Sequence, residues 1–352
     1  MSAVHTVTVE PAGRQVTCRE DQPILDACLR NGIWLPHSCT HGTCGTCKAS
    51  LLDGSVDHGD ASAFALMDFE RDDGKLLLCQ ATPRTDLTIE GDVEVDDGIE
   101  FSPVRDFTGT VVDLTDIARD IRRTRIELDE DMTFCAGQYV ALAVPGKNVT
   151  RTYSMANPPS ERRVLELHVK RTPGGLASDG WIFAGLGVGE RVTLSGPYGR
   201  FVFRAGRSEP AIMVAGGTGL APITSMVRHV LADPASAHEL FLYQGARTRA
   251  DVYGVEEFRE LAERHPDRFH YQPCLSEEDW DGARGRVTDV IDRDFARCAG
   301  YVGYLCGSPP MVDAALKLLM RKRLFPRDIF REDFFDESDK AAGGMKSPLL
   351  KR

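Results

Sequence analysis

The sequence predicts a multidomain protein in which an α+β unit precedes an antiparallel β-barrel and a doubly wound parallel sheet. Three changes of pattern along the 352 residues support this prediction. Residues 1–95 combine alternating strands with a short helix, residues 103–205 contain short strands separated by Gly and Pro, and residues 206–337 alternate strands with helices. Residues 338–352 are expected to form a polar C-terminal tail.

The first unit is expected to begin with two paired strands, because His5–Val9 and Gln15–Cys18 alternate in polarity. Ile24–Asn31 has the pattern of a short helix, with Asp21 as its expected cap. Later strands of this unit are expected at Leu76–Cys79 and Leu87–Glu90.

The barrel and the parallel sheet are expected from the segments that follow. The barrel strands are predicted at Thr108–Leu114, Ile121–Leu128, Tyr139–Val144, Thr152–Met155, Leu165–Lys170 and Arg191–Ser195. The strands of the parallel sheet are predicted at Ala211–Ala215, Leu240–Gln244, His270–Cys274 and Gly303–Cys306. The helices that alternate with them are predicted from Ala221, over Val255–Arg264, near Thr288–Asp294 and from Pro310.

Four cysteines carry the clearest chemical signal. They follow the spacing C-x4-C-x2-C with a distant fourth cysteine, and they are Cys39, Cys44, Cys47 and Cys79. This is the plant-type pattern for a [2Fe–2S] cluster, in which each iron takes two thiolates. Gly42 and Gly45 lie between the ligands, where small residues let backbone N–H groups turn toward the sulfurs.

The alternatives for these cysteines are a zinc site and disulfide bonds. Structural zinc sites usually present two C-x2-C-type pairs, whereas Cys79 stands alone in the sequence. Disulfide bonds need an oxidising compartment, and the chain begins without the pattern of a signal peptide. The six other cysteines show no paired spacing, which suits free thiols in the reducing cytoplasm.

Composition and charge exclude several classes of function. Hydrophobic residues make up 42% of the chain and no apolar run approaches the length of a membrane span, so no membrane partner is expected. The net charge of −11 makes nucleic acid an unsuitable partner. The stretch Thr85–Glu100 is acidic and has two interpretations. We favour a solvated linker between domains, and the alternative is that it forms one edge of a docking surface for a basic partner.

The barrel segment contains two motifs suited to a flavin nucleotide. Arg151 can pair a pyrophosphate, Tyr153 can stack on a flat ring, and Ser154 can hydrogen-bond a ring nitrogen. Downstream, glycines precede a helix expected over Asp179–Ala184 and suit a phosphate. Further cofactor-binding candidates in this segment are His168, Lys170, Gly174, Gly175 and Ser178.

The parallel-sheet segment contains a glycine turn between a strand and a helix, where a pyrophosphate can approach the backbone. The candidates in this turn are Gly216, Gly217, Thr218 and Gly219. Arg247 ends the next strand, where an adenosine ribose is expected. Cys306 and Gly307 end a later strand at the edge where such sheets bind ligands, although a free Cys is more usually a buried apolar residue.

The order of these motifs resembles the ferredoxin–NAD(P)H reductase superfamily, and especially the reductase components of bacterial multicomponent oxygenases. The resemblance covers nearly the whole chain and implies a β-grasp ferredoxin domain, an FAD barrel and an NAD(P)H domain. It implies that Arg151 contacts the FAD pyrophosphate and that Tyr153 and Ser154 lie at the isoalloxazine. It also implies that Glu332 lies near the nicotinamide, with Phe334 or Phe335 close to the flavin.

Finer features resemble the reductase components of phenol hydroxylases. They are Trp34–Pro36, Ala61–Asp68, Arg323–Phe330 and Ser347–Arg352. The resemblance implies a monomeric, cytoplasmic, NADH-dependent reductase that passes electrons through FAD and the cluster to a diiron hydroxylase, which it meets transiently. Cys306 and Glu332 are expected to be catalytic together with Tyr153 and Ser154.

Three alternatives for the function stay open. One is the reductase of a Rieske aromatic-ring dioxygenase of the benzoate type, and another is a sugar-deoxygenating iron–sulfur flavoreductase. The third is a redox or iron sensor whose cluster serves only as a switch.

Overall fold

The computed structural model describes residues 2–93 and 98–334. The expected tail over 338–352, Phe335 and the acidic residues Glu94, Asp96 and Asp97 lie outside the described residues. The chain divides into two compact units. Among the described residues, one contains those up to Arg105 together with Gly196–Arg200, and the other contains Asp106–Ser195 and residues 201–334.

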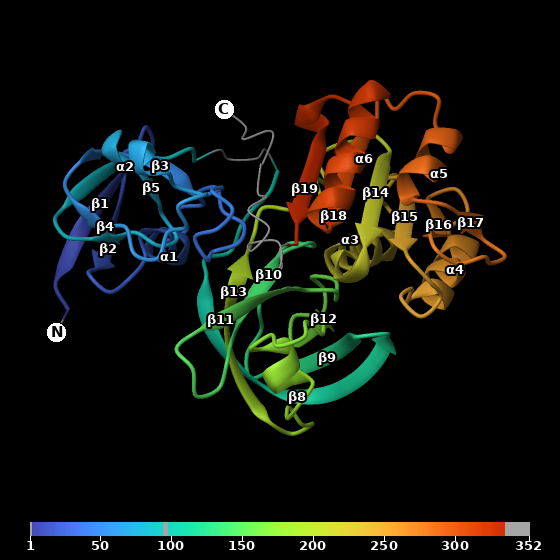
Figure 1. Ribbon diagram of the computed structural model, residues 1–352, viewed down its shortest axis with the longest axis horizontal. Coiled ribbons are helices and arrows are strands. Elements are labelled where there is room, and N and C mark those ends of the chain that lie inside the picture. Colours follow the sequence, from blue (N-terminus) through green and yellow to red (C-terminus); the bar gives the residue numbers. More distant parts are fainter. Residues whose placement is uncertain (1, 94–97, 335–352) are drawn as a thin grey trace. The chain divides into compact units, whose positions relative to one another are not determined.

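The first unit is built on a five-stranded mixed sheet (Figure 1). The strand order is β2-β1-β7-β3-β5, in which β1 pairs with β7 in parallel and with β2 antiparallel. The bounds are β1 Val4–Glu10, β2 Arg14–Arg19, β3 Lys48–Asp53, β5 Lys75–Leu77 and β7 Leu87–Glu90. Helix α1, Ile24–Arg30, buries five of its seven residues. Shorter elements are β4 Val56–Asp57, α2 Asp68–Asp72 and β6 Thr82–Pro83.

The expected cap of α1 is wrong. The residue before the helix is Pro23, and no side chain caps the first turn. The Asp21 carboxylate instead accepts a 2.9 Å hydrogen bond from Nε of Arg19. A charged neighbour two residues away is a stronger partner for an exposed carboxylate than the amides of a helix that starts three residues later.

The second unit begins with a six-stranded antiparallel sheet of order β11-β10-β13-β8-β9-β12. Its strands are β8 Arg105–Ala118, β9 Ile121–Leu128, β10 Tyr139–Ala143, β11 Thr150–Ser154, β12 Val164–Lys170 and β13 Arg191–Tyr198. An antiparallel bridge between Met155 and Leu167 joins the two ends of this order, so the sheet closes into a barrel. Buried apolar side chains fill the barrel, including Val111, Ile126 and Leu142.

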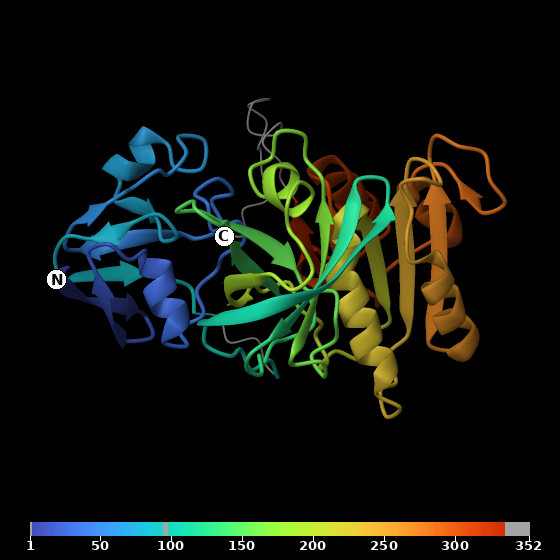
Figure 2. The same cartoon turned by 90° about the horizontal axis from the view of Figure 1, so that it is seen from below.

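The remainder of the second unit is a parallel sheet with helices on both faces (Figures 1 and 2). The strand order is β17-β16-β15-β14-β18-β19, and the reported pairs are all parallel. The strands are β14 Ala211–Gly216, β15 Leu240–Ala246, β16 Phe269–Leu275, β17 Ala283–Arg284, β18 Val302–Gly307 and β19 Ile329–Asp333. The helices are α3 Leu220–Ala232, α4 Val255–Arg264, α5 Val287–Asp294 and α6 Pro309–Arg321.

The helices α3 and α4 contribute to one core, and α5 and α6 contribute to another on the opposite face of the sheet. The core under α3 also contains Ala136, Phe201 and Phe203. Residues of the barrel part therefore extend the core under α3, while the barrel interior keeps a core of its own. The predicted fold class is confirmed, because an α+β unit, an antiparallel barrel and a parallel sheet with alternating helices follow one another in the expected order. Among residues 2–93 and 98–334, no helix combines the length and apolar character that a membrane span requires.

Candidate cofactor sites

The four predicted iron ligands come from two places in the first unit. Cys39, Cys44 and Cys47 lie on the loop between α1 and β3, and Cys79 lies two residues beyond the end of β5. The antiparallel pairing of β3 with β5 continues past the strands, because the N–H of Leu78 donates to the carbonyl of Cys47 at 3.1 Å. The sheet thereby brings the fourth cysteine to the loop.

The thiols lie in two neighbouring pairs, Cys39 beside Cys44 and Cys47 beside Cys79. The interaction within each pair lowers the pKa of Cys39 and Cys79 and raises the pKa of Cys44 and Cys47. In the described part of the chain, no group of three or more His, Cys, Asp and Glu residues is placed to hold a single metal ion. Two pairs of thiols fit a binuclear cluster, in which each iron takes two thiolates.

Backbone N–H groups around these thiols suit a negatively charged cluster. The N–H of His41 lies 3.4 Å from the sulfur of Cys39, and the backbone of Gly42 helps to lower the pKa of the Cys79 thiol. Gly42 has φ of +74°, and a Cβ there would lie 2.7 Å from Cγ of Gln80. A residue without a side chain is therefore required at this point of the loop.

His37 lies at the start of the loop and was not singled out from the sequence. Its imidazole is buried, and the N–H of Gly199 donates to its Nε2 at 2.9 Å. Its Nδ1 therefore carries the hydrogen and donates to the carbonyl of Leu35 at 2.8 Å. Burial lowers the pKa of His37 to about 4, so it holds these two segments in its neutral form. The sequence signal was only a His two residues before the first ligand.

The predicted flavin motif lies on β11. Arg151 and Tyr153 alternate with Thr152 and Ser154, so the guanidinium and the phenol project from one face of the strand. Burial raises the pKa of Tyr153, which keeps its hydroxyl protonated at neutral pH. Ser154 is buried, and Arg151 is half-buried with Nη1 donating to the carbonyl of Thr150 at 2.8 Å. These side chains have the chemistry that a flavin and a pyrophosphate require.

The glycine turn after β12 is held by hydrogen bonds within the turn itself. The N–H of Gly174 donates to the carboxylate of Asp179 at 2.9 Å, and the N–H of Gly175 donates to the carbonyl of Thr172 at 2.8 Å. A Cβ on Gly175 would lie 2.8 Å from Oγ of Ser178. Both glycine N–H groups are thus engaged within the turn, and the following helix is a five-residue π-helix, Ser178–Ile182, instead of the expected Asp179–Ala184. The assignment of this turn to a phosphate stays a prediction.

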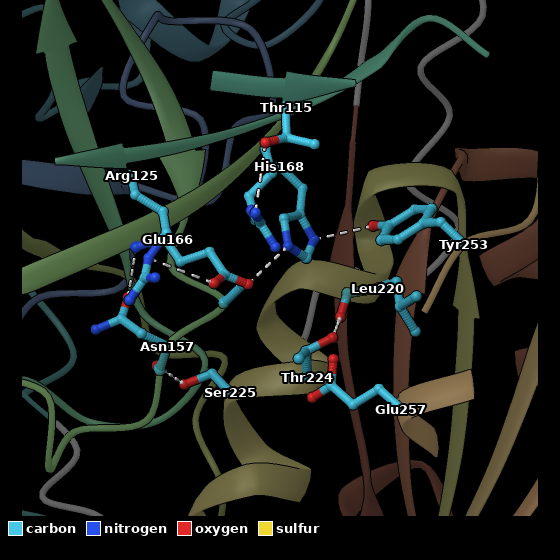
Figure 3. A network of polar contacts seen from close by, with 12 residues as sticks. Thr115, Arg125, Asn157, Glu166, His168, Leu220, Thr224, Ser225, Tyr253 and Glu257 are labelled. Carbon is cyan, nitrogen blue, oxygen red and sulfur yellow. Dashed lines mark hydrogen bonds and ion pairs between the residues drawn. The ribbon is translucent and has the colours of Figure 1, made fainter. Parts of the chain in front are cut away.

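His168 and Lys170 differ in their surroundings although they lie on the same face of β12. Lys170 is exposed at the end of the strand. His168 is buried, with Nε2 at 3.1 Å from Oε1 of Glu166 and Nδ1 at 3.1 Å from the hydroxyl of Tyr253 (Figure 3). Both ring nitrogens of His168 are therefore used by protein groups.

The glycine turn after β14 forms a tight corner at the carboxyl end of the parallel sheet. Gly217 has φ of +56°, and the single 3₁₀ turn Gly217–Gly219 leads into α3. A Cβ on Gly219 would lie 2.4 Å from the carbonyl oxygen of Cys306. A Cβ on Gly216 would lie 2.6 Å from Sδ of Met311. Backbone atoms leave room only for glycine at position 219, and the resulting corner at a helix start suits a pyrophosphate.

The strand ends place the predicted catalytic pair side by side. Cys306 on β18 is in register with Ala215 on β14 and with Glu332 on β19. Cys306 is fully buried, and burial with the nearby Glu332 carboxyl raises the pKa of its thiol. Burial, with a smaller contribution from Asp333, raises the pKa of Glu332 to about 8. Its Oε2 is buried and has no hydrogen-bond partner among the described residues, which suits a carboxyl reserved for a ligand.

Two further predicted residues lie at the same end of the sheet. The N–H of Phe334 donates to the carbonyl of Gly307 at 2.8 Å, so its ring begins directly beyond β19. Arg247 follows β15 and is exposed, with Nε at 4.0 Å from the carboxylate of Asp251. The structure thus brings the glycine turn, Cys306, Glu332 and Phe334 together at one edge.

Sequence reasoning missed the polar residues that join the barrel to the parallel sheet. Asn157, Glu166, Arg228 and Tyr253 take part in these contacts, which Figure 3 shows in part, and Glu257 on α4 binds the same Arg228 side chain. Nη1 of Arg228 donates to Glu166 at 3.1 Å, and Nε of the same guanidinium donates to Glu257 at 2.6 Å. Glu166 could have been singled out from the sequence, because it is a charged residue within the otherwise apolar part of β12.

Comparison with known protein families agrees with this division. Residues 7–84 match the 2Fe-2S iron-sulfur cluster binding domain. Residues 108–203 match the oxidoreductase FAD-binding domain, and residues 213–317 match the oxidoreductase NAD-binding domain. The three predicted cofactors, a [2Fe–2S] cluster, FAD and a nicotinamide dinucleotide, are thereby supported.

Relatives match along almost the entire chain. The reductase component of phenol 2-monooxygenase from Pseudomonas sp. is 46% identical over 353 residues, which cover 99% of each chain. A solved cytochrome P450 reductase from Amycolatopsis has a TM-score of 0.87 and 45% identity, covering 94% of this chain and 98% of its own. The ferredoxin reductase of carbazole 1,9a-dioxygenase has a TM-score of 0.81 and 28% identity, covering 95% and 99%. The chain therefore belongs to the iron–sulfur flavoprotein reductase components of multicomponent monooxygenases, within the ferredoxin–NAD(P)H reductase superfamily.

Proposed function

We propose that this protein takes electrons from NADH and delivers them to the diiron hydroxylase of a phenol hydroxylase-type monooxygenase. The observation that carries the proposal is the 46% identity to a phenol 2-monooxygenase reductase component, with 99% of both chains covered. When bound, FAD can accept two electrons from a nicotinamide and release them singly to an iron–sulfur cluster, an exchange that the other two cofactors cannot make directly.

We assign a cofactor to each group of site residues. The thiol pairs Cys39 with Cys44 and Cys47 with Cys79 hold the cluster. The residues assigned to FAD are Arg151, Tyr153, Ser154, Lys170, Gly174, Gly175, Ser178 and Phe334. The residues assigned to the nicotinamide dinucleotide are Gly216, Gly217, Thr218, Gly219, Arg247, Cys306, Gly307 and Glu332.

A second candidate acceptor is a cytochrome P450. It is favoured by the solved cytochrome P450 reductase from Amycolatopsis, whose identity of 45% is close to that of the phenol 2-monooxygenase relative. The dioxygenase alternative has weaker support, from the ferredoxin reductase of carbazole 1,9a-dioxygenase, which is 28% identical. The sensor alternative is set aside because the chain belongs to a family of oxidoreductases.

Encounter with the hydroxylase is proposed to be transient, because one reductase serves many turnovers and redox encounters bury little surface. The protein is proposed to act as a cytoplasmic monomer. The net charge of −11 leads us to expect that association depends on salt when acidic residues contribute.

NADH is proposed as the preferred nucleotide. Recognition of NADPH requires an unpaired cation for the 2′-phosphate. Arg249 is held by two carboxylates, with Nε at 3.2 Å from Glu278 and Nη2 at 3.7 Å from Asp281. Arg247 faces the carboxylate of Asp251. Both arginines beyond β15 therefore have acidic neighbours that oppose a second phosphate.

Replacing Glu278 by Ala tests this account of nucleotide choice. The parent protein should have a higher kcat/KM for NADH than for NADPH. Glu278→Ala should raise kcat/KM for NADPH about 2- to 10-fold, the range expected for freeing one charge-assisted contact, and should leave kcat/KM for NADH unchanged. Equal kcat/KM values for the two nucleotides in the parent would contradict the preference.

Replacing Cys79 by Ser tests the fourth ligand of the cluster. Loss of this thiolate removes one of the two ligands on one iron, so the EPR signal of the reduced cluster should disappear or shift strongly. Cys18→Ser is the matched control, because Cys18 is buried in the same unit and its Sγ donates to the carbonyl of Gln22 at 3.3 Å. Unchanged iron content and EPR in Cys79→Ser would remove Cys79 from the ligand set.

The pKa of Glu332 predicts a pH dependence. A pKa raised from 4.5 to about 8 keeps this carboxyl protonated at pH 7, and it ionises as the pH rises through 8. NADH turnover with an artificial acceptor should fall over that range, whereas Glu332→Gln should keep a flat profile because an amide does not ionise. Glu239→Gln, which changes a carboxyl at the other end of the strands, should retain the parental profile. The assignment would be lost if Glu332→Gln declined in the same way as the parent.

The acceptor is tested by reconstitution. The protein, NADH, a phenol hydroxylase diiron component and its small effector protein should together oxidise phenol. Parallel reactions contain a cytochrome P450 or a Rieske dioxygenase in place of the diiron component. Efficient turnover in either parallel reaction, with none in the phenol reaction, would transfer the function to that alternative.

A further inference from the structure

A continuous line of polar contacts runs from barrel strand β12 to the glycine turn after β14. Figure 3 shows the imidazole of His168 between the carboxylate of Glu166 and the hydroxyl of Tyr253. On its other side, the Tyr253 hydroxyl lies 3.3 Å from the carbonyl oxygen of Gly217. Glu166, His168 and Tyr253 are each less than 10% exposed, so bulk water does not compete for these contacts.

The protons in this line can be placed from the chemistry of its members. Burial favours the neutral form of Glu166, but the hydrogen bond from His168 and the charge of Arg228 prevail and lower its pKa to about 2. An ionised carboxylate only accepts, so Nε2 of His168 carries a hydrogen and donates it. Burial raises the pKa of Tyr253, which keeps its proton. The Tyr253 hydroxyl donates its single hydrogen to the carbonyl of Gly217, so its oxygen is left to accept from Nδ1 of His168.

The carbonyl of Gly217 determines where the next N–H group points. In a trans peptide the carbonyl and the following N–H are antiparallel, so holding the oxygen of Gly217 sets the direction of the N–H of Thr218. The N–H of Leu220 also donates to this oxygen, as part of the first turn before α3. The N–H of Thr218 must then point away from the helix, in the direction from which a phosphate approaches a helix start.

The same helix is held on the barrel further along. Oγ of Ser225 donates to the carbonyl of Asn157 at 2.7 Å, and Nη1 of Arg228 donates to Glu166 at 3.1 Å. Glu166 thus contacts the middle of α3 through Arg228 and the turn before α3 through His168 and Tyr253. These links fix the turn and its helix relative to β12.

We propose that Tyr253 and His168 are positioning residues for the nicotinamide dinucleotide, acting through the carbonyl of Gly217 to aim the turn and tying that turn to the flavin barrel. The proposal deepens the assignment of the dinucleotide to the turn Gly216–Gly219 and rests on it. In this proposal His168 positions the turn and does not bind a cofactor directly, since both of its ring nitrogens contact protein groups.

Tyr253→Phe is the test, because it removes the hydroxyl and keeps the ring in the core. Equilibrium binding of NAD⁺ to the oxidised protein, loaded with FAD and cluster, should weaken about 2- to 10-fold, as expected for one lost hydrogen bond. KM for NADH should rise by the same factor, while kcat and FAD content stay at the parental values. This separation of KM from kcat distinguishes positioning from a general loss of structure.

Tyr304→Phe is the matched control. Tyr304 is also fully buried in the parallel sheet, and its hydroxyl accepts from the N–H of Arg204 at 2.9 Å, away from the turn. It should leave NAD⁺ affinity unchanged. Parental affinity in Tyr253→Phe, or equal weakening in Tyr304→Phe, would overturn the proposal.

His168→Phe tests the second half of the line. If His168 acts through the Tyr253 hydroxyl, adding His168→Phe to Tyr253→Phe should change NAD⁺ affinity no further. Additive effects, or loss of FAD from His168→Phe with unchanged NAD⁺ affinity, would make His168 independent of the turn and contradict its part in the proposal. Absence of NAD⁺ binding to the parent would instead contradict the assignment of the turn itself.

Discussion

The contact between two backbones at the carboxyl end of the parallel sheet is the constraint on which the nucleotide region depends. The turn after β14 touches the end of β18 so closely that a Cβ on Gly219 would lie 2.4 Å from the carbonyl oxygen of Cys306. Gly307 is similarly confined, since a Cβ there would lie 3.0 Å from the carbonyl oxygen of Gly216. The main chain of the turn packs directly against the main chain of β18, and these glycines carry no side chains. A nucleotide at this edge therefore contacts polar backbone groups.

The barrel and the parallel sheet are fastened by charged groups as well as by a shared core. Arg228 is the central group, because it reaches a strand of the barrel through Glu166 and a second helix through Glu257. The neighbouring carboxylates raise the pKa of Arg228 against the opposing effect of burial, so the cation persists although it is largely removed from water. Removing one partner of such a pair leaves an uncompensated buried charge, which destabilises a protein far more than loss of an exposed ion pair.

The sequence predicted the features that depend on local pattern. Cysteine spacing, strand–helix alternation and the glycine turn are visible as patterns along the chain, so the fold class and the three cofactors can be inferred from the sequence alone. The cap of α1 was misassigned because Asp21 has a nearer partner in Arg19. The strand Lys48–Asp53 went unnoticed because it follows the last loop cysteine without a turn residue between them.

Contacts between distant segments could not be predicted in the same way. His168 and Tyr253 are separated by 85 residues, and nothing in either neighbourhood specifies the other. A histidine in a strand is equally compatible with a cofactor, a carboxylate or solvent, and only the fold decides which group it meets. The sequence could therefore name His168 as a candidate but could not identify its partners.

The pairing of the four thiols has a consequence for how the protein acquires its iron. Because the antiparallel pairing of β3 with β5 already brings Cys79 to the loop of the other three thiols, the fold itself gathers the four cysteines. Neighbouring free thiols are also open to oxidation, and a disulfide between two of them would remove thiolates that an iron requires. Cluster insertion must therefore precede oxidation of the thiols, so that newly made chains receive iron while their cysteines are still reduced.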